Sequence, residues 1–267
     1  ASFSATVRTV RFDVVVVGAG TAGANAALQF ARRGRSVLLA ERRTADRGGA
    51  QWHNGVLDRH FVRAGIAPPV APERVDDHAT SRIVGPDGWL GPVVTSPTVR
   101  ADMSALGERL RAAALDAGVE LLDGARVREL ELVGPRLRAA HLHVETPDEA
   151  SRTVRVDADL FVDASGWTGV LRRDPRLLAG WCPAPRGTEL CAAADLHLRV
   201  GDTDGAKRFL ERHGADAGDH ITQLGVHGGW STRSISVSGD LEQVSLLVGC
   251  VADGRHGTVA GLVAAAL

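Results

Sequence analysis

The stretch VVVVGAGTAGANAALQFARRGRSVLLAER, residues 14–42, decides the fold of this chain. Val14–Val17 is a continuous β-branched run, which is typical of a strand buried on both faces of a parallel sheet. Residues 21–33 are rich in Ala and Leu and predict a helix, which Gly34 ends because glycine accepts the left-handed conformation past a helix. Residues 36–40 predict a second strand. The stretch therefore predicts a strand, a tight turn, a helix and a parallel strand.

The turn contains three glycines in the pattern G-x-G-x-x-G. Gly18 permits the tight turn, Gly20 lets a diphosphate approach the backbone, and Gly23 lets the helix pack closely on the strand. Unpaired N–H groups and the positive end of the helix dipole favour phosphate there, at Thr21, Ala22 and Gly23. The pattern predicts a dinucleotide site.

An acidic residue follows the second strand. Glu41 comes 21 residues after Gly20, where a carboxylate accepts hydrogen bonds from the hydroxyls of a ribose. A 2′-phosphate would be repelled at this position. We therefore expect FAD or NAD, with Glu41 and the neighbouring Arg42 beside the adenosine half.

Composition excludes several classes of protein. The 267 residues are 44% hydrophobic with a net charge of −1 and no basic tract, which disfavours nucleic acid as a partner. No apolar run is long enough to span a bilayer and no signal-peptide core is present, so we expect a cytoplasmic protein. Cys182, Cys191 and Cys250 are expected to be reduced, buried thiols. His141 and His143 lack a third ligand at recognisable spacing, so no metal is expected.

The rest of the chain predicts two domains. A hairpin around Pro86-Asp87-Gly88, about 78–97, is expected as an insertion in the first domain, followed by a helix over 102–117 capped by Asp102. Short strands then form a meander, with 152–158 and 159–163 as separate strands. From residue 175, strands with one helix predict a second layer. The uncapped helical pattern that ends at Leu267 leads us to expect further sequence downstream.

The predicted fold class is α/β. It comprises a Rossmann-like FAD/NAD(P)-binding parallel sheet with a β-meander crossover over residues 10–174, and a partial antiparallel-sheet substrate domain over 175–267. The second domain is expected to be incomplete.

Three segments together resemble a known family. They are DVVVVGAGTAGANAALQFARRGRSVLLAER (13–42), TVRADMSALGERLRAAALDAGVELLDGARV (98–127) and DLFVDASGWTGVLRR (159–173). In this order they are similar to the FAD-dependent oxidoreductases that include aromatic hydroxylases, geranylgeranyl reductases and flavin-dependent halogenases. The resemblance implies FAD as the cofactor. It also implies that Arg100 contacts FAD and that the backbone at Val127 meets the adenine.

The third segment departs from the hydroxylase pattern. It reads Asp163-Ala164-Ser165-Gly166, the D-A-x-G form that is more frequent in the reductase-like branch, and the resemblance places Asp163 and Gly166 near the cofactor. We therefore expect a reductase-like enzyme acting on an apolar or aromatic small molecule. A flavin monooxygenase and a non-catalytic dinucleotide-binding or redox-sensing module remain as alternatives. The oligomeric state is not predicted.

Two further expectations concern the chemistry. His53 lies where related flavoenzymes pass near the isoalloxazine ring, and a histidine there could donate a proton near neutral pH. An ordinary exposed polar loop is the competing explanation of His53. Because one dinucleotide fingerprint is present, a nicotinamide reductant would have to bind without a second Rossmann unit. The resemblance implies that NAD(P)H docks transiently on the flavin face.

Overall fold

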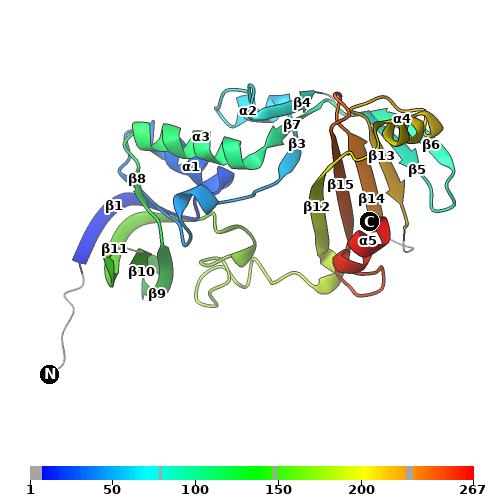
Figure 1. Cartoon of the computed structure of the whole chain (residues 1–267). Coiled ribbons are helices and arrows are strands. Elements are labelled where there is room, and N and C mark those ends of the chain that lie inside the picture. Colours follow the sequence, from blue (N-terminus) through cyan, green and yellow to red (C-terminus); the bar gives the residue numbers. More distant parts are fainter. Residues whose placement is uncertain (1–7, 78–79, 147–148, 227–230) are drawn as a thin grey trace. The chain divides into compact units, whose positions relative to one another are not determined.

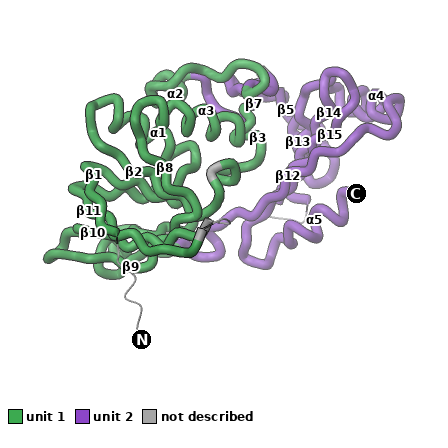
Figure 2. The backbone as a smooth tube through the Cα atoms, turned by 60° about the vertical axis from the view of Figure 1, so that its left-hand side comes forward, with its two compact units in different colours: residues 1–54, 59–73, 101–184 green, residues 55–58, 74–100, 185–267 purple. Residues whose placement is uncertain are grey.

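The computed structural model describes residues 8–77, 80–146, 149–226 and 231–267. These residues form two compact units, each assembled from separate chain segments (Figure 2). The first unit contains residues up to 54, 59–73 and 101–184. The second contains residues 55–58, 74–100 and 185–267.

The first unit is built on a six-stranded sheet in the order β8-β2-β1-β11-β10-β9. Its strands are β1 (Arg8–Val17), β2 (Val37–Ala40), β8 (Glu120–Leu122), β9 (Ala125–Val133), β10 (Arg136–Thr146) and β11 (Glu149–Asp163). β8, β2, β1 and β11 run parallel, whereas β10 and β9 are antiparallel. This arrangement confirms the Rossmann-like parallel sheet with a meander crossover.

Helices α1 (Thr21–Ala31) and α3 (Met103–Asp116) lie on the same side of this sheet (Figure 1). Between them and the meander, each residue of Val14–Val17 is buried, as a strand covered on both faces requires. The Asp102 carboxylate accepts hydrogen bonds from the N–H groups of Ser104 and Ala105 and so caps α3, as predicted. Gly34 and Gly118 both follow their helices with positive φ.

Strand β11 differs from the prediction of two strands over 152–158 and 159–163. It is one strand of 15 residues. Its first part pairs with β10 as far as Ala139 opposite Asp157, and β1 pairs along its opposite edge to Asp163. A single strand can therefore belong both to the meander and to the parallel sheet, which a local pattern does not reveal.

The second unit contains a six-stranded sheet in the order β12-β15-β14-β13-β5-β6. Its elements are β5 (Thr80–Val84), β6 (Leu90–Thr95), β12 (Cys191–Arg199), α4 (Thr203–Arg212), β13 (His220–Leu224), β14 (Ser231–Val237), β15 (Gln243–Val251) and α5 (Val259–Ala266). Leu210 of α4 packs with Val84, Ile221 and Val237, and Leu262 of α5 packs with Leu246 and Val248.

The predicted hairpin forms, but it belongs to the second unit. β5 and β6 pair antiparallel around the turn, and β5 also pairs in parallel with β13, with Ser81 opposite His220. The hairpin was expected as an insertion in the first domain, but residues 74–100 group with the second unit, because a pairing between distant residues decides where the hairpin lies. Residues 78 and 79 of the predicted range lie outside the described residues.

Shorter elements complete the fold. A three-stranded sheet has the order β3-β7-β4, with β3 (His53–Leu57), β4 (Arg74–Asp77) and β7 (Thr98–Asp102), and α2 (Asp58–Arg63) follows β3. The last segment of the second unit begins at Pro185, near the predicted boundary at 174/175. Cys250 is buried, but Cys182 and Cys191 are exposed, which corrects the expectation of three buried thiols. Within the described ranges, no helix combines the length and apolar character needed to cross a membrane.

Candidate dinucleotide site

The glycine turn between β1 and α1 is closed by backbone contacts. Gly18 has a φ of +105°, and a Cβ added there would lie 2.4 Å from the carbonyl oxygen of Ala164, just after β11. A Cβ on Gly23 would lie 1.8 Å from the carbonyl oxygen of Gly18. Two of the three glycines are therefore required by the turn itself and by its contact with the neighbouring strand.

The N-terminus of α1 has no side-chain cap among the residues that the structure describes. Gly20 is its N-cap residue and supplies no side-chain hydrogen bond, and the first turn contains no acidic residue. Thr21 is half-buried and Ala22 is exposed. The first N–H groups of a helix need partners outside the helix, and the dipole makes an anion a favourable one. The geometry suits a phosphate group on the backbone of this turn.

Glu41 directly follows β2 and is only 5% exposed. One carboxylate oxygen accepts a hydrogen bond from the N–H of Ala19 at 2.8 Å, and the other accepts one from the N–H of Arg43 at 3.0 Å. A carboxylate has about four acceptor positions, so two bonds leave capacity for ribose hydroxyls. The predicted acid therefore lies against the glycine turn, whereas the Arg42 side chain is exposed.

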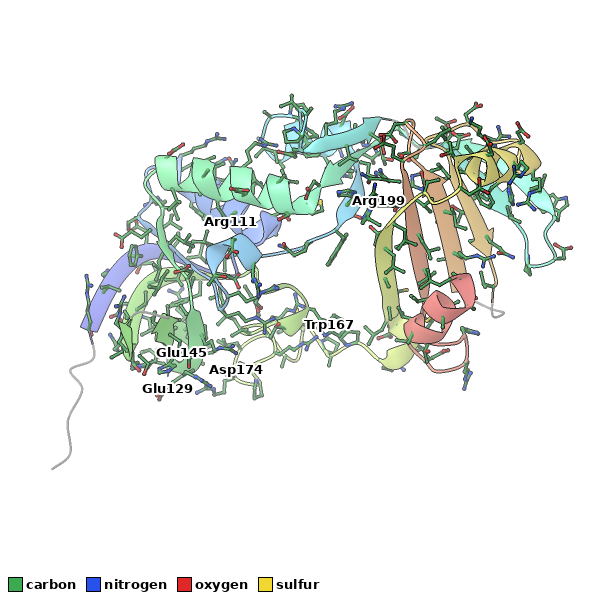
Figure 3. The ribbon with its side chains drawn as sticks, in the orientation of Figure 1. Arg111, Glu129, Glu145, Trp167, Asp174 and Arg199 are labelled. Carbon is green, nitrogen blue, oxygen red and sulfur yellow. The ribbon has the colours of Figure 1, made fainter. Side chains whose placement is uncertain are left out.

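Gly49, in the loop after β2, packs against the turn, a contact that the sequence did not predict. A Cβ on Gly49, at a φ of +83°, would lie 2.9 Å from the Cα of Gly20. Buried Arg111 of α3 donates from Nη1 to the carbonyl oxygens of Ala19 at 3.1 Å and Gly48 at 3.3 Å (Figure 3). One guanidinium thus links the turn to the loop after β2.

Asp163 at the end of β11 organises the segment that follows it. One carboxylate oxygen accepts from the N–H and the hydroxyl of Ser165, at 3.0 and 2.5 Å. The other accepts from the N–H groups of Leu171 and Arg172, both at 2.8 Å. Burial alone would raise the pKa of Asp163, but these four hydrogen bonds outweigh it and lower the pKa. In this structure the carboxylate orders the loop around Gly166, which has a φ of +63°.

The remaining predicted residues lie in different surroundings. Val127 is half-buried in β9, opposite Leu142. His53 begins β3 and is also half-buried. Arg100 lies in β7 and falls in the second unit, where its guanidinium pairs with Asp76 at 2.6 Å. The structure therefore brings Gly18, Gly20, Gly23 and Glu41 together, but it does not place Arg100 among them.

The histidine pair has protein partners. His141 contacts the Glu131 carboxylate at 2.5 Å, and His143 lies 3.3 Å from that of Glu145. Across the described parts of the chain, no group of three or more His, Cys, Asp or Glu side chains is arranged to hold a metal ion.

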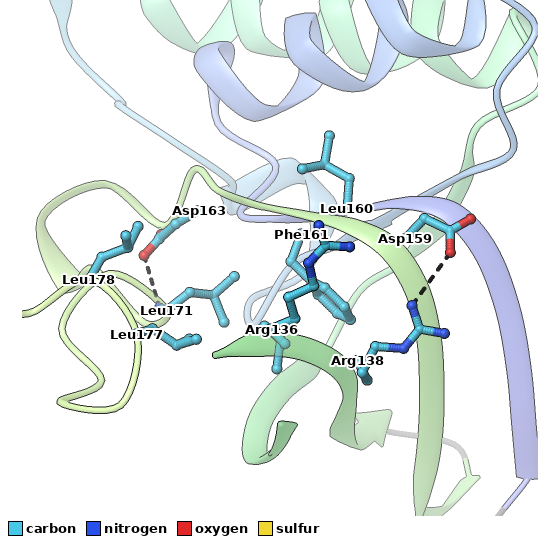
Figure 4. Close-up of a pocket in the computed structure, with 10 residues that line it drawn as sticks. Arg136, Arg138, Asp159, Leu160, Phe161, Asp163, Leu171, Leu177 and Leu178 are labelled. Atoms are coloured by element: carbon cyan, nitrogen blue, oxygen red, sulfur yellow. Dashed lines mark hydrogen bonds and ion pairs between the residues drawn. The ribbon is translucent and has the colours of Figure 1, made fainter. Parts of the chain in front are cut away.

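A separate cavity of about 380 Å³ lies where β10 and β11 diverge (Figure 4). Its walls combine leucines and Phe161 with Arg136 and Arg138, and Arg138 pairs with Asp159 at 3.7 Å. Of the residues expected to bind a dinucleotide, Asp163 alone lines it. This cavity is therefore distinct in its lining from the glycine turn.

Comparisons with known proteins agree with this geometry. A family model for FAD dependent oxidoreductases matches residues 13–173. Digeranylgeranylglycerophospholipid reductase 2 of Methanothermobacter thermautotrophicus is 28% identical over 200 residues, covering 73% of this chain and 49% of that protein. Thiamine thiazole synthase of Pyrobaculum neutrophilum is 32% identical over 159 residues, covering 58% and 56%.

The crystal structure of a geranylgeranyl bacteriochlorophyll reductase-like protein from Thermoplasma acidophilum shares the fold. Its TM-score is 0.71 at 17% identity, over 91% of this chain and 57% of that one. The chain spans about half the length of the two curated relatives. The family model covers more than half of the chain and confirms the predicted resemblance. The chain belongs to the FAD dependent oxidoreductase family.

Proposed function

We propose that the protein is a reductase-like FAD-dependent oxidoreductase that acts on an apolar or aromatic small molecule. One observation carries the cofactor assignment. At the glycine turn, the first N–H groups of α1, which no side chain caps, are proposed to bind the diphosphate. The turn is linked to the buried carboxylate of Glu41 because the N–H of Ala19 donates a hydrogen bond to that carboxylate. Diphosphate and ribose are adjacent groups in FAD, and these two features match them in type and order.

The residues around the turn would divide the binding as follows. The N–H groups of Thr21, Ala22 and Gly23 would donate to the diphosphate. The diphosphate could approach the backbone closely at Gly20, because this residue has no side chain. Glu41 would accept hydrogen bonds from the ribose hydroxyls. Its negative charge would repel a 2′-phosphate. When bound, FAD would supply the hydride chemistry, while the protein supplies binding, orientation and electrostatics.

The other predicted positions remain part of the proposal. We propose that the backbone at Val127 meets the adenine and that the loop held by Asp163, including Gly166, borders the cofactor. Arg100 is proposed to contact FAD because of its position in the family pattern, and Arg42 because it follows Glu41. His53 is proposed as a proton donor, with an ordinary polar loop as the competing explanation.

The reductase-like assignment has two supports. The D-A-x-G form of residues 163–166 is the pattern more frequent in the reductase branch. A curated relative is also named as a digeranylgeranylglycerophospholipid reductase. Since a second relative is named as a thiamine thiazole synthase, the shared portion alone does not specify one activity. We propose NAD(P)H as the reductant, binding transiently near the flavin.

The test uses the full-length protein. We expect it to purify with the absorbance spectrum of a bound flavin, and we expect NADH or NADPH to bleach that spectrum under anaerobic conditions in a stopped-flow instrument. Oxygen consumption that depends on substrate would favour the monooxygenase alternative, and bound flavin that neither nicotinamide reduces would favour the non-catalytic one. A colourless protein that binds no added FAD would contradict the cofactor assignment itself.

A further inference from the structure

Arg111 is a buried arginine in the middle of helix α3. The residue is only 6% exposed, and Nη1 donates to the carbonyl oxygens of Ala19 and Gly48. The two acceptors lie in segments that are separate in the sequence: Ala19 in the glycine turn and Gly48 in the loop after β2. The helix makes room for the guanidinium at Gly107, since a Cβ there would lie 3.0 Å from Nη1.

The contact that Arg111 bridges is a close backbone approach. Gly20 and Gly49 face each other, and a Cβ on Gly20 would lie 3.1 Å from the Cα of Gly49. Glycines lose more conformational entropy on folding than other residues, so two facing glycine segments need a partner that fixes them. The two hydrogen bonds from Arg111 provide that constraint. They set the position of the backbone at the start of α1.

The charge of Arg111 has no protein counter-ion among the described residues. Both of its acceptors are neutral carbonyl groups, and no carboxylate of the described chain lies within ion-pair distance. Arg109, two residues earlier in the same helix, shows the usual arrangement, with its Nε 2.6 Å from a carboxylate oxygen of Glu73. A buried charge without a partner is costly, and an anion bound nearby lowers that cost.

We infer that Arg111 is a positioning residue for the diphosphate of the bound dinucleotide. It holds the loop at Gly48 against the glycine turn, and it places a positive charge behind the N-terminus of α1. Both effects favour an anion at the turn. The inference rests on the proposed function, but it concerns a residue of α3 that lies outside the fingerprint.

The experiment measures binding rather than turnover. After bound flavin has been removed, ADP, which carries the diphosphate, and adenosine, which lacks it, are titrated calorimetrically into the wild type, Arg111→Met, Arg111→Lys and Arg63→Met. Arg63 is exposed in α2 and controls for the loss of one positive charge. For Arg111→Met we expect ADP affinity to fall by about tenfold, with a weaker salt dependence and little change for adenosine. Arg111→Lys should recover part of the affinity, and Arg63→Met should bind as the wild type does.

Each outcome separates the inference from the proposed function. A wild type that binds neither ADP nor FAD contradicts the proposed function. A wild type that binds ADP no better than Arg111→Met contradicts the role of Arg111 alone. Equal losses for ADP and adenosine also contradict it, because they indicate general damage to the fold. If Arg111→Met does not fold, Arg111→Lys provides the test. This variant retains the positive charge, so ADP binding that lacks the salt dependence of the wild type would overturn the inference.

Discussion

A Cβ on Gly23 would lie 1.8 Å from the carbonyl oxygen of Gly18, so helix α1 begins in direct contact with the turn that precedes it. This contact fixes where the first N–H groups of the helix lie relative to β1. Any side chain at residue 23 would separate the two backbones. The position of the N–H groups proposed to bind the diphosphate therefore depends on residue 23 having no side chain.

Gly23→Ala tests this dependence. Because the methyl group meets backbone and not a flexible side chain, we expect the free energy of unfolding to fall by about 1–3 kcal/mol or more and FAD binding to be lost. Denaturant unfolding and flavin titration measure the two effects. Gly180→Ala is the matched control, since nothing lies within 4 Å of a Cβ there, and its stability should change by less than about 0.5 kcal/mol. Normal flavin binding by Gly23→Ala would contradict this account of the turn.

Local patterns predicted the parts of the fold that are formed by neighbouring residues. The buried run Val14–Val17, the start of α1 at Thr21 and the Asp102 cap of α3 all involve contacts within a few positions. Such features have clear propensities and spacings. Glu41 was also predictable, because the βαβ unit fixes the number of residues between the turn and the end of the second strand.

Contacts between distant segments were not predictable in this way. Arg111 binds a carbonyl 92 residues earlier in the chain, and nothing in the pattern of α3 distinguishes it from Arg109. The hairpin at 80–95 was recognised as a hairpin, but the parallel pairing of Ser81 with His220 decides which unit it joins. A single sequence contains no local signal for either contact.

Glu41→Gln probes the acidic position. The two carboxylate oxygens accept hydrogen bonds from the N–H groups of Ala19 and Arg43. In the Gln variant, the side-chain NH2 group would face one of these N–H groups, and two donors cannot form a hydrogen bond. We expect a loss of about 1–3 kcal/mol in the free energy of unfolding. The wild type should bind ADP more tightly than 2′-phospho-ADP, and the difference between the two affinities should be smaller for the variant.

The control for Glu41→Gln is Glu108→Gln, at an exposed position of α3. It removes the same charge and should change stability by less than about 0.5 kcal/mol. A Glu41→Gln variant that discriminates against the 2′-phosphate as strongly as wild type would show that another residue selects the ribose.

Asp102→Ala tests the cap of α3, the helix that carries Arg111. Its carboxylate accepts from the N–H of Ser104 at 2.8 Å and that of Ala105 at 3.2 Å. We expect a loss of about 1 kcal/mol in thermal or denaturant unfolding, and Asp102→Asn should retain most of it, because asparagine caps nearly as well. Equal losses for the two variants would indicate that the charge, and not the cap, stabilises the helix.

Asp163 should make the protein sensitive to acid. Its pKa is lowered in the folded state, since the hydrogen bonds from Ser165, Arg172 and Leu171 outweigh the effect of burial. A lowered pKa means that the carboxylate contributes stability above its unfolded pKa of about 3.9, and that this contribution is lost as the pH falls toward the lower folded value.

Asp163→Asn keeps one acceptor oxygen but turns the side-chain NH2 group toward backbone donors, so we expect it to lower the free energy of unfolding by about 2 kcal/mol at pH 7. Denaturant unfolding of both proteins between neutral and acidic pH should show the difference in stability shrinking below about pH 4. A difference that stays constant over that range would show that the charge of Asp163 does not order the loop, and that its shape alone does.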